Sequence, residues 1–524
     1  MAILSSDPDR GFFGHPRALM PLFFTEMWER FSFYGMRTLL ILYLVSHFAF
    51  PRDRAYDTLS AYLALVYLLP LFGGLLADRL LGYQRAVMIG AFLMLLGHVV
   101  MAYEGGGGDD PLAVGAMFLA LSLLSVGNGF MKPNISSMVG KLYAPDDQRR
   151  DAGFSIFYFS INLGAFVATL ICGWLGETWG WSYGFGAAAF GMALGLVVFS
   201  RSRPMLPRDE LVSMGTGRVL SQQPGIPVWM WAVIPAAVVV SWWLMQRADI
   251  VGILLAVSAF AMIGMVLYQM ATKATKVGRD RMIVALVLTL FAVFFWMLFD
   301  QSPGSLKLLA DHFVDRQGWG ASQFEALNPL FIVLMAPLMA TLWTILAARG
   351  KDLSLPVKFA LGLLFNGIAF GLLVIAMQNP ESGVLMSLWW LVLFYWVQAL
   401  GELCLSPIGL SMITRLSMPG TTGVMMGIWF LSTAGGAWLA GQTAKWFSAP
   451  EEVTGFDAAY GFTDLFWNLF WPACAAGVIV LLLAPWLKRM MHIGVDAATV
   501  RSAGLDQGLA AESRSVPGAA KGAE

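Results

Sequence analysis

The chain has 524 residues, of which 58% are hydrophobic and only 13% are charged. Soluble domains carry about 25% charged residues, so this composition excludes a protein that exposes its whole surface to water. The formal net charge is zero, and a neutral chain has no global basic field with which to attract nucleic acid. Length and composition therefore predict a membrane protein without a nucleic-acid partner.

Fourteen apolar segments follow one another along the chain, separated by Gly, Pro or charged clusters. Most are long enough to cross a hydrocarbon core of roughly 30 Å. The first is too long for a cleaved signal peptide, so we expect it to remain as the first span. The segments cover approximately residues 18–48, 56–77, 84–103, 112–132, 151–174, 182–200, 227–244, 249–271, 282–302, 325–347, 355–377, 384–414, 421–445 and 464–487.

Lysine and arginine residues concentrate in every second loop. If the N-terminus is cytoplasmic, the loops assigned to the cytoplasm hold twenty-one of these residues and the opposite loops hold six. Cytoplasmic loops of membrane proteins carry such an excess of Lys and Arg. The pattern predicts fourteen spans, an even number, with both termini in the cytoplasm.

A linker at 201–226 and a basic stretch at 272–281 bracket two segments, leaving six segments before them and six after. Two six-helix halves around a midplane site are the plan of the major facilitator superfamily. The loop from Gly74 to Arg85 resembles the signature loop of that superfamily, although its Asp78 and Arg79 could be simple loop charges. We therefore expect an all-α fold with an N-terminal six-helix bundle (1–200), linkers with a two-helix insert (201–281), a C-terminal six-helix bundle (282–490) and a disordered cytoplasmic tail (491–524).

After the loop charges are assigned, three basic and four acidic residues are counted inside the spans. Each such charge at the centre of a bilayer costs roughly 2.5–3.5 kcal/mol on insertion scales. Facing lipid is therefore unfavourable for them, and we expect these side chains to face the protein interior, to pair with one another or to line water. They are Glu26, Glu29, Arg30, Arg37, Lys132, Asp300 and Glu402.

The first segment carries four of these charges. At about 100° per residue, Glu26, Arg30 and Arg37 share one face of a helix, and Glu29 flanks it. A guanidinium group matches a carboxylate in geometry and stays charged when buried, whereas a carboxylate beside it can take up a proton. These charges could merely pin helices together, but four of them on one helix favour a functional role.

The other three charges allow two interpretations each. Lys132 ends the fourth segment and could extend to the cytoplasmic interface, and Asp300 could cap the end of the ninth. Glu402 precedes Pro407, which we expect to kink the span and to free carbonyl groups beside the acid. The first half thus contributes bases and the second half acids, an arrangement that would fit a zwitterion between them.

Several motifs together resemble the proton-dependent oligopeptide transporter (POT) family, over nearly the whole chain. The first segment reads Glu26-x-x-Glu29-Arg30-Phe31-x-x-Tyr34-Gly35, which is similar to the most specific motif of that family. The two additional central segments are also similar to those of bacterial members. Further matches are Phe157-Tyr158-x-x-Ile161-Asn162-x-Gly164, Phe295-Trp296 with Gln301, Asn328-Pro329, Gly401-Glu402 with Ser406-Pro407, and Trp429-Phe430-Leu431.

The resemblance implies a symporter of the bacterial inner membrane that imports di- and tripeptides together with protons. It assigns proton coupling to Glu26, Glu29, Arg30 and Lys132. It assigns the peptide carboxylate to Arg30, Lys132 and Tyr34, and the peptide amine to Glu402 and Asn328. It makes Arg37 and Asp300 a gating pair. The cavity would further be lined by Tyr67, Asn162, Trp296, Ser406 and Trp429.

Three positions depart from the family pattern: Phe33 replaces a common tyrosine, Asp300 a glutamate and Ala437 an asparagine. Asp300 shortens one arm of the gating pair by a methylene and so puts the geometry of that pair in doubt. None of the three touches the paired acids or Arg30, so proton coupling is retained as the expectation.

Two other functions compete with peptide import. A relative that carries nitrate or another small anion would not need Glu402, because a single anion has no amine to bind. A membrane enzyme or a receptor is disfavoured because the sequence has no phosphate-binding Gly-x-x-x-x-Gly-Lys motif and its five histidines are widely separated. The three cysteines are scattered in apolar segments. We expect no cofactor or metal beyond the coupling proton, and a functional monomer.

Overall fold

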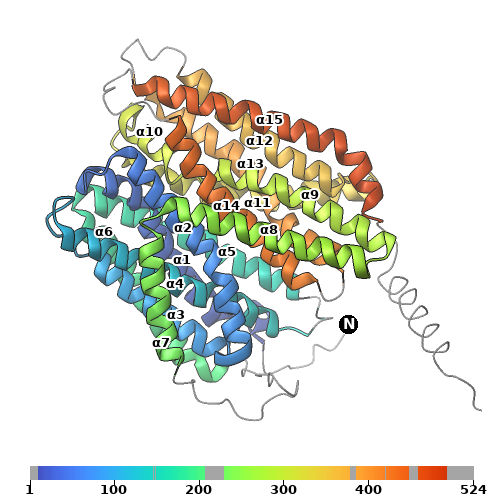
Figure 1. The fold of residues 1–524 in the computed structure, drawn as a ribbon, viewed down its shortest axis with the longest axis horizontal. Helices are drawn as coiled ribbons and strands as arrows, with labels where there is room; N and C mark the ends of the chain where they lie inside the picture. The colour runs from blue at the N-terminus through green and yellow to red at the C-terminus, as the bar shows by residue number, and fades with distance from the viewer. Residues whose placement is uncertain are drawn as a thin grey trace, which may run out of the picture.

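The computed structural model describes residues 10–144, 147, 149–206, 229–377, 385–418, 421–447 and 458–492. Long α-helices make up nearly all of this part of the chain (Figure 1). The strands in it are very short: β1 (Arg10–Phe12) lies antiparallel to β2 (His15–Pro16), and β3 (Val314–Asp315) lies parallel to β4 (Met386–Ser387). The predicted all-α class is confirmed. Most of the predicted tail, from residue 493 onward, lies outside the described residues.

The helices follow the predicted segments closely. The helices of the N-terminal part are α1 (Leu19–Leu42), α2 (Arg52–Leu76), α3 (Tyr83–Met101), α4 (Pro111–Lys141), α5 (Arg150–Thr178) and α6 (Trp181–Ser202). The two central helices are α7 (Met230–Leu244) and α8 (Ala248–Lys273). The C-terminal part contains α9 (Lys276–Phe299), α10 (Ser305–Phe313), α11 (Leu327–Ala348), α12 (Leu355–Ala376), α13 (Leu388–Leu416), α14 (Thr422–Trp446) and α15 (Ala458–Met490). Short turns of other helix types include η1 (Tyr43–His47), η2 (Ala77–Leu81), η3 (Arg203–Met205) and η4 (Ala321–Ala326).

One predicted boundary is wrong. The predicted fourth segment ends at Lys132, directly before Pro133, and proline in a helix removes a hydrogen bond. Instead α4 continues through Pro133 to Lys141. Helices that are packed by their neighbours in a membrane tolerate proline, and α4 is held by α2 and α3. Lys132 is therefore an interior residue of a long helix.

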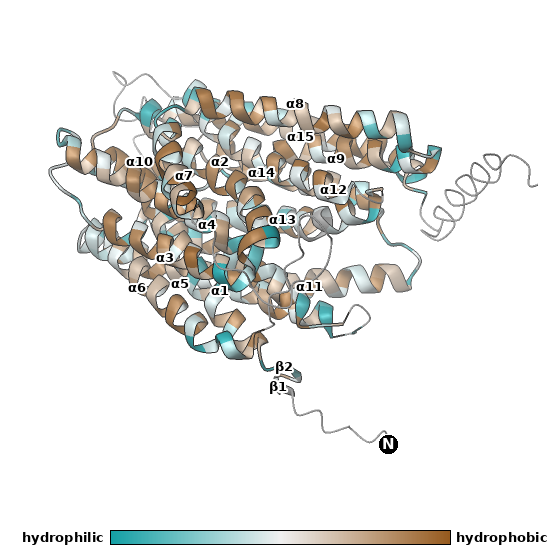
Figure 2. Cartoon of the chain, turned by 60° about the horizontal axis from the view of Figure 1, so that its bottom comes forward, coloured by the Kyte–Doolittle hydropathy of each residue, from teal (hydrophilic) through white to brown (hydrophobic). Residues whose placement is uncertain are grey.

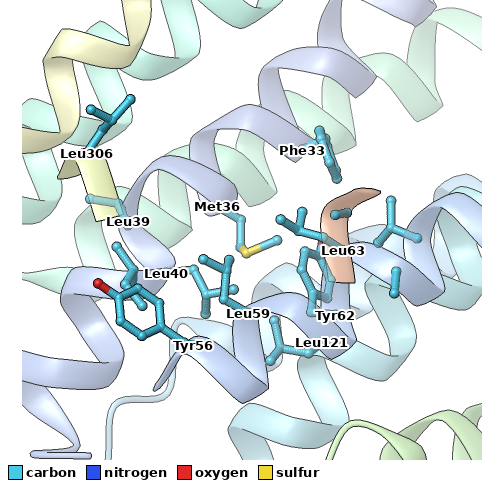
Figure 3. Packing of buried hydrophobic residues seen from close by; sticks show 14 of the residues in the cluster. Phe33, Met36, Leu39, Leu40, Tyr56, Leu59, Tyr62, Leu63, Leu121 and Leu306 are labelled. Atoms are coloured by element: carbon cyan, nitrogen blue, oxygen red, sulfur yellow. The ribbon is translucent and has the colours of Figure 1, made fainter. Parts of the chain in front are cut away.

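The short helix α10 (Ser305–Phe313) was not predicted. Its sequence lies in the expected external loop between the ninth and tenth segments. The helix buries Leu306, Leu309 and Phe313, and Leu306 lies close to α1 (Figure 3). The helix therefore packs one apolar face against the bundle and brings its polar residues close to α1.

Twelve helices in the described part of the chain are long and apolar enough to cross a membrane. This set leaves out α1, which carries the four charges noted above, and α7, which has only 15 residues. Hydrophobic residues predominate along the long helices (Figure 2). Large apolar side chains lie exposed on several of them, among them Ile253 and Phe260 of α8 and Leu482 of α15. Such surfaces are expected where a protein faces lipid. The count of fourteen spans and the cytoplasmic position of the termini stay predictions.

The N-terminal and C-terminal helices gather on different sides of the molecule (Figure 1). Helix α1 packs against α5 and α6, and α3 packs against α4, whereas α12 packs against α13 and α15. Contact between the two groups is extensive along α2 and α14. The two central helices divide between the groups, because α7 packs on α4 and α8 packs on α14. The seam between the groups is where the charged face of α1 lies.

Small residues allow the N-terminal helices to approach one another closely. A Cβ atom added at Gly73 of α2 would lie 2.0 Å from the carbonyl oxygen of Gly129 in α4. No side chain larger than a hydrogen atom fits there, because real Cβ atoms do not come this close to backbone. The pair therefore sets the distance between α2 and α4.

The apolar side of α1 packs into a buried core shared with α2. Met36 and Leu40 of α1 lie against Leu59 and Leu63 of α2 (Figure 3). All four side chains are almost completely buried. Tight packing of this kind fixes the rotation of a helix about its axis. It therefore determines where the charged face of α1 points.

Candidate functional site

The four charges of α1 are all buried. Glu29 is completely inaccessible, and Glu26, Arg30 and Arg37 are each 2–3% exposed. Charges are rarely this buried unless they are paired. The predicted interior position of these residues is confirmed, and each of the two arginines is the centre of a separate ion-pair group.

Arg30 is the centre of the first group. Its Nη2 donates to Glu29 Oε1 at 2.6 Å, and its Nε also pairs with the second oxygen of Glu29. Glu26 Oε1 lies 3.4 Å from the same Nε. Asn128 of α4 donates a further hydrogen bond of 3.0 Å to Glu29 Oε1. One guanidinium thus holds two carboxylates, but it holds Glu29 with more bonds than Glu26.

Lys132 adds a second positive charge beside this group. It is partly buried, and its Nζ lies 5.0 Å from the centre of the Tyr67 ring. It is within electrostatic range of Glu26 and Glu29. The alternative in which Lys132 reaches the interface from a helix end does not hold, because α4 continues beyond it to Lys141. The four residues predicted for proton coupling therefore lie together.

The close approach of α5 supports the position of Arg30. A Cβ atom at Gly164 would lie 2.3 Å from the carbonyl oxygen of Met27 and 3.1 Å from Cβ of Arg30. Glycine at this position allows α5 to contact the backbone of α1 directly beside the charged group. The same helix supplies Tyr158 and Asn162 to the seam between the two helix groups.

Arg37 is the centre of the second group. Its Nη2 lies 3.3 Å from Asp300 Oδ1 at the end of α9, and its Nε lies 3.3 Å from Glu325 Oε1 in η4. Lys307 Nζ of α10 lies 2.6 Å from the other oxygen of Glu325 and donates to the carbonyl of Thr38 at 2.6 Å. Asp300 is 3% exposed and ion-paired. It is therefore not simply a solvent-exposed residue that caps the end of the ninth segment. The two bases, Arg37 and Lys307, and the two acids, Asp300 and Glu325, thus have formal charges that sum to zero.

Glu325 and Lys307 were missed by the sequence interpretation. Glu325 begins the tenth apolar segment and is not among the seven charges counted inside the spans, and Lys307 lies in the loop expected between the ninth and tenth segments. The apolar pattern of residues 305–313 carried a usable signal, since its apolar positions recur at helical spacing. Only the fold brings both residues to Arg37.

Further polar contacts close the same end of the molecule. Glu177 of α5 accepts hydrogen bonds from the backbone N–H groups of Ala321 and Ser322 at 2.9 and 2.7 Å. Asp57 of α2 accepts from Lys445 and Gln442 of α14 at 2.8 and 2.9 Å. These bonds join the N-terminal helices to the C-terminal ones near the C-terminal end of α1. The two groups are therefore bonded together at this end.

Glu402 lies on the C-terminal side of the seam. Asn328 Nδ2 of α11 donates to Glu402 Oε2 of α13 at 3.1 Å, and both side chains are partly exposed. Glu402 is within electrostatic range of Arg37 and Asp300, and Tyr158 is within range of Glu402. An acid with one amide partner thus lies within electrostatic range of the basic face of α1.

The remaining predicted residues differ in how accessible they are. Tyr34, Tyr67, Trp296 and Ser406 are partly exposed, and Nε1 of Trp296 has no hydrogen-bond partner among the described residues. Asn162 is 8% exposed, and its amide donates to the backbone carbonyl of Tyr158. Trp429 is 4% exposed, and Gly409 leaves the space that its ring fills. The first four side chains are thus accessible, whereas Asn162 and Trp429 lie in packing positions.

The fold and the site together define a multi-pass membrane transporter whose charged residues meet at the seam between two helix groups. Comparison with known proteins agrees. The family model of the POT family matches residues 84–461. An uncharacterized transporter of Bacillus subtilis, YclF, is 38% identical over 94% of this chain and 98% of its own length. The peptide transporter YePEPT of Yersinia enterocolitica is 36% identical, over 92% of this chain and 96% of its own length.

Solved structures extend the similarity to three dimensions. The structure of a mutant of the peptide transporter POT in complex with alafosfalin has a TM-score of 0.77 and 38% identity, covering 93% of this chain and 98% of its own. A POT family transporter in complex with 5-aminolevulinic acid has a TM-score of 0.77 and 30% identity, covering 91% and 98%. This chain belongs to the POT family, and the predicted transporter fold of the major facilitator type is confirmed.

Proposed function

We propose that the chain is a proton-coupled symporter that imports di- and tripeptides across the bacterial inner membrane by alternating access. The observation that carries this proposal is the placement of Arg30, held between two buried carboxylates, on one side of the seam and Glu402 on the other. The relatives named as peptide transporters support peptides as the cargo. A dipeptide or tripeptide is a zwitterion, and its two charged ends match these two sides.

The peptide carboxylate is proposed to bind Arg30, Lys132 and the hydroxyl of Tyr34. Guanidinium and ammonium groups form strong charge-assisted hydrogen bonds with a carboxylate. The peptide amine is proposed to bind Glu402 and Asn328, which already share a hydrogen bond of 3.1 Å. Tyr67, Trp296 and Ser406 are partly exposed around these groups and would contact the peptide between its ends.

Proton coupling follows from the charge balance around Arg30. Two bases and two acids lie together, so an arriving peptide carboxylate adds one negative charge and competes for Arg30. Protonation of one glutamate restores the balance. Glu26 is the proposed acceptor, since Glu29 keeps a hydrogen bond from Asn128, whereas Glu26 Oε2 has no hydrogen-bond partner among the described residues.

The group around Arg37 is the proposed gate. Opening this end of the seam would separate Arg37 on α1 from Asp300 and Glu325, which follow α9 and precede α11. The excess of Lys and Arg in alternate loops would place this end outside the cell. In this proposal the closed end faces outward, both termini are cytoplasmic, all fourteen long segments span the membrane, and a monomer works without a cofactor other than the proton.

Uptake by proteoliposomes tests the function. With an inward-directed proton gradient, the protein is expected to accumulate dialanine, and Glu402→Ala is expected to abolish that accumulation. Asp352→Asn is the control. Asp352 is an exposed acid in the connection between α11 and α12, where it pairs with Lys358 of α12. Accumulation of dialanine without a gradient, or of nitrate in place of dialanine, would overturn the proposal.

A further inference from the structure

A cavity of about 1070 Å³ lies apart from the ion-pair groups around Arg30 and Arg37 and borders the contact between Asp57 and Lys445. It is formed where the turn between α7 and α8 meets the first turns of α2 and the last turns of α14. These are the ends of long apolar helices, so the cavity lies at the level where a membrane interface would meet the protein. It opens over the α2–α14 seam that joins the two helix groups.

The turn between α7 and α8 is attached to both helix groups. Trp242 of α7 donates from Nε1 to the carbonyl of Gly115 in α4 at 3.3 Å. Trp438 of α14 donates from Nε1 to the carbonyl of Ala248 in α8 at 2.8 Å, and its ring lies against Gly252. The cavity is therefore built from the N-terminal group, the C-terminal group and the central helix pair at once.

One part of the cavity wall is apolar. Phe118 and Met245 are almost completely buried at its base, whereas Ile253 of α8 is 61% exposed. Ala256 continues this wall one turn further along α8. The wall thus runs from the helix ends along the membrane-facing side of α8, in the direction that an acyl chain would take.

The other part of the wall carries charges of both signs. Arg54 and Arg247 stack on the rings of Phe50 and Trp243, at 3.7 and 5.8 Å from the ring centres. Neither arginine has an ion-pair partner in the described part of the chain. Asp53 and Asp249 also line the cavity and are exposed, and no acceptor bond to either is present among the described residues.

The last two charges in the wall form an ion pair with each other. Lys445 pairs with Asp57 at 2.8 Å across the seam. Asp53 and Asp249 are within electrostatic range of the same lysine but form no ion pair with it among the described residues. The groups left to bind a ligand directly are therefore two guanidinium groups and two carboxylates. A purely anionic ligand would meet the carboxylates, whereas a ligand with one negative and one positive group can satisfy both signs.

We propose that this cavity binds a phospholipid with a zwitterionic headgroup that carries a free amine, as in phosphatidylethanolamine. Its phosphate would bind Arg54 and Arg247, its ammonium group would donate to Asp53 and Asp249, and an acyl chain would lie along α8. Such a lipid contacts α2, α8 and α14 together. It therefore stabilises the arrangement in which this end of the seam is closed, whatever cargo the protein carries.

Lipid retention by the purified full-length protein tests this proposal. Delipidated protein in detergent is incubated with equimolar phosphatidylethanolamine, phosphatidylcholine and phosphatidylglycerol, and bound lipid is counted by native mass spectrometry. Phosphatidylethanolamine is expected to exceed phosphatidylcholine by about fivefold or more, since only its amine can donate charge-assisted hydrogen bonds to the carboxylates. It is also expected to raise the thermal midpoint of the protein more than phosphatidylcholine does.

Two double variants test the binding of the two ends of the headgroup separately. Asp53→Asn with Asp249→Asn should retain lipid but lose the preference for the free amine. Arg54→Gln with Arg247→Gln should lose retention of both zwitterionic lipids, whereas Arg349→Gln with Lys351→Gln, in an exposed connection outside the cavity, should behave as the wild type. Equal retention of all three lipids, a preference for phosphatidylglycerol, or an unchanged preference in the aspartate variant would overturn the proposal. Displacement by free glycerophosphoethanolamine would also overturn it, because the acyl chain would then be dispensable.

Discussion

Arg30 makes more and shorter contacts with Glu29 than with Glu26. Glu29 receives two bonds from the guanidinium and one from Asn128, whereas Glu26 makes one longer contact. Removing one member of a buried charged group leaves an uncompensated charge, and the size of that effect depends on how many bonds the member makes. This difference in bonding supports the proposal that Glu26, rather than Glu29, changes its protonation state.

Glu26→Gln tests this division. A glutamine is a permanent analogue of the protonated acid, so the charge balance around Arg30 is kept without a proton step. We therefore expect exchange of external for internal dialanine to stay within about threefold of the wild-type rate. Gradient-driven accumulation should be lost. Both are measured in the same proteoliposomes, and loss of exchange together with accumulation would assign Glu26 to binding instead.

Lys307 and Glu325 form an ion pair that can be tested by stability. Lys307→Met leaves Glu325 with Arg37 alone, and Glu325→Gln leaves Lys307 without its ion-pair partner. Each single change should destabilise the protein, by roughly 3–5 kcal/mol for a fully buried pair. The double variant should lose less than the sum, because neither charge is then left unpaired. Thermal unfolding in detergent measures this, and strict additivity would show that the two residues act independently.

At the scale of the helices, α1 combines a packed apolar face with a charged face. Met36 and Leu40 hold one side against α2 (Figure 3), and Gly164 brings α5 to the other side. Helices that approach so closely depend on the absence of side chains at the contact. The distances within the charged groups are thus set by small residues that carry no charge.

Gly73→Ala is the corresponding test. The added methyl group would lie 2.0 Å from the carbonyl of Gly129, so α2 and α4 must separate, at a cost of about 1–3 kcal/mol. Gly115→Ala in α4 is the control, because a Cβ atom there meets nothing within 4 Å. We expect a lower thermal midpoint and weaker dialanine uptake for Gly73→Ala only. Equal midpoints for the two variants would contradict the role given to this contact.

At the scale of the whole molecule, the two helix groups are bonded together near the C-terminal end of α1. Arg37, Glu177 and Asp57 each bond a residue of the C-terminal group there. Alternating access by rocking of two halves requires these bonds to break in each cycle. A covalent link at this end should therefore stop transport while leaving the fold intact.

A cysteine pair at Gly173 and Ser322 provides that link. A Cβ atom at Gly173 would lie 3.3 Å from Cβ of Ser322, close to the separation of about 3.5–4.5 Å found in disulfides. In a background where the native cysteines are replaced by alanine, oxidation should reduce dialanine uptake by about tenfold or more, and a reductant should restore it. Each single cysteine variant should be insensitive to oxidation. Full activity of the cross-linked protein would rule out opening at this end.

The sequence alone determined the membrane class, the order of the helices and most of the candidate site. Apolar segments of membrane length and the spacing of charges on α1 are local patterns, and such patterns can be recognised in the sequence without knowledge of the fold. The tertiary structure decided the rest. Glu325 and Lys307 meet Arg37 only because α10 folds back onto α1, and α4 passes Pro133 only because α2 and α3 hold it. Both depend on contacts between segments far apart in the chain, which no local pattern encodes.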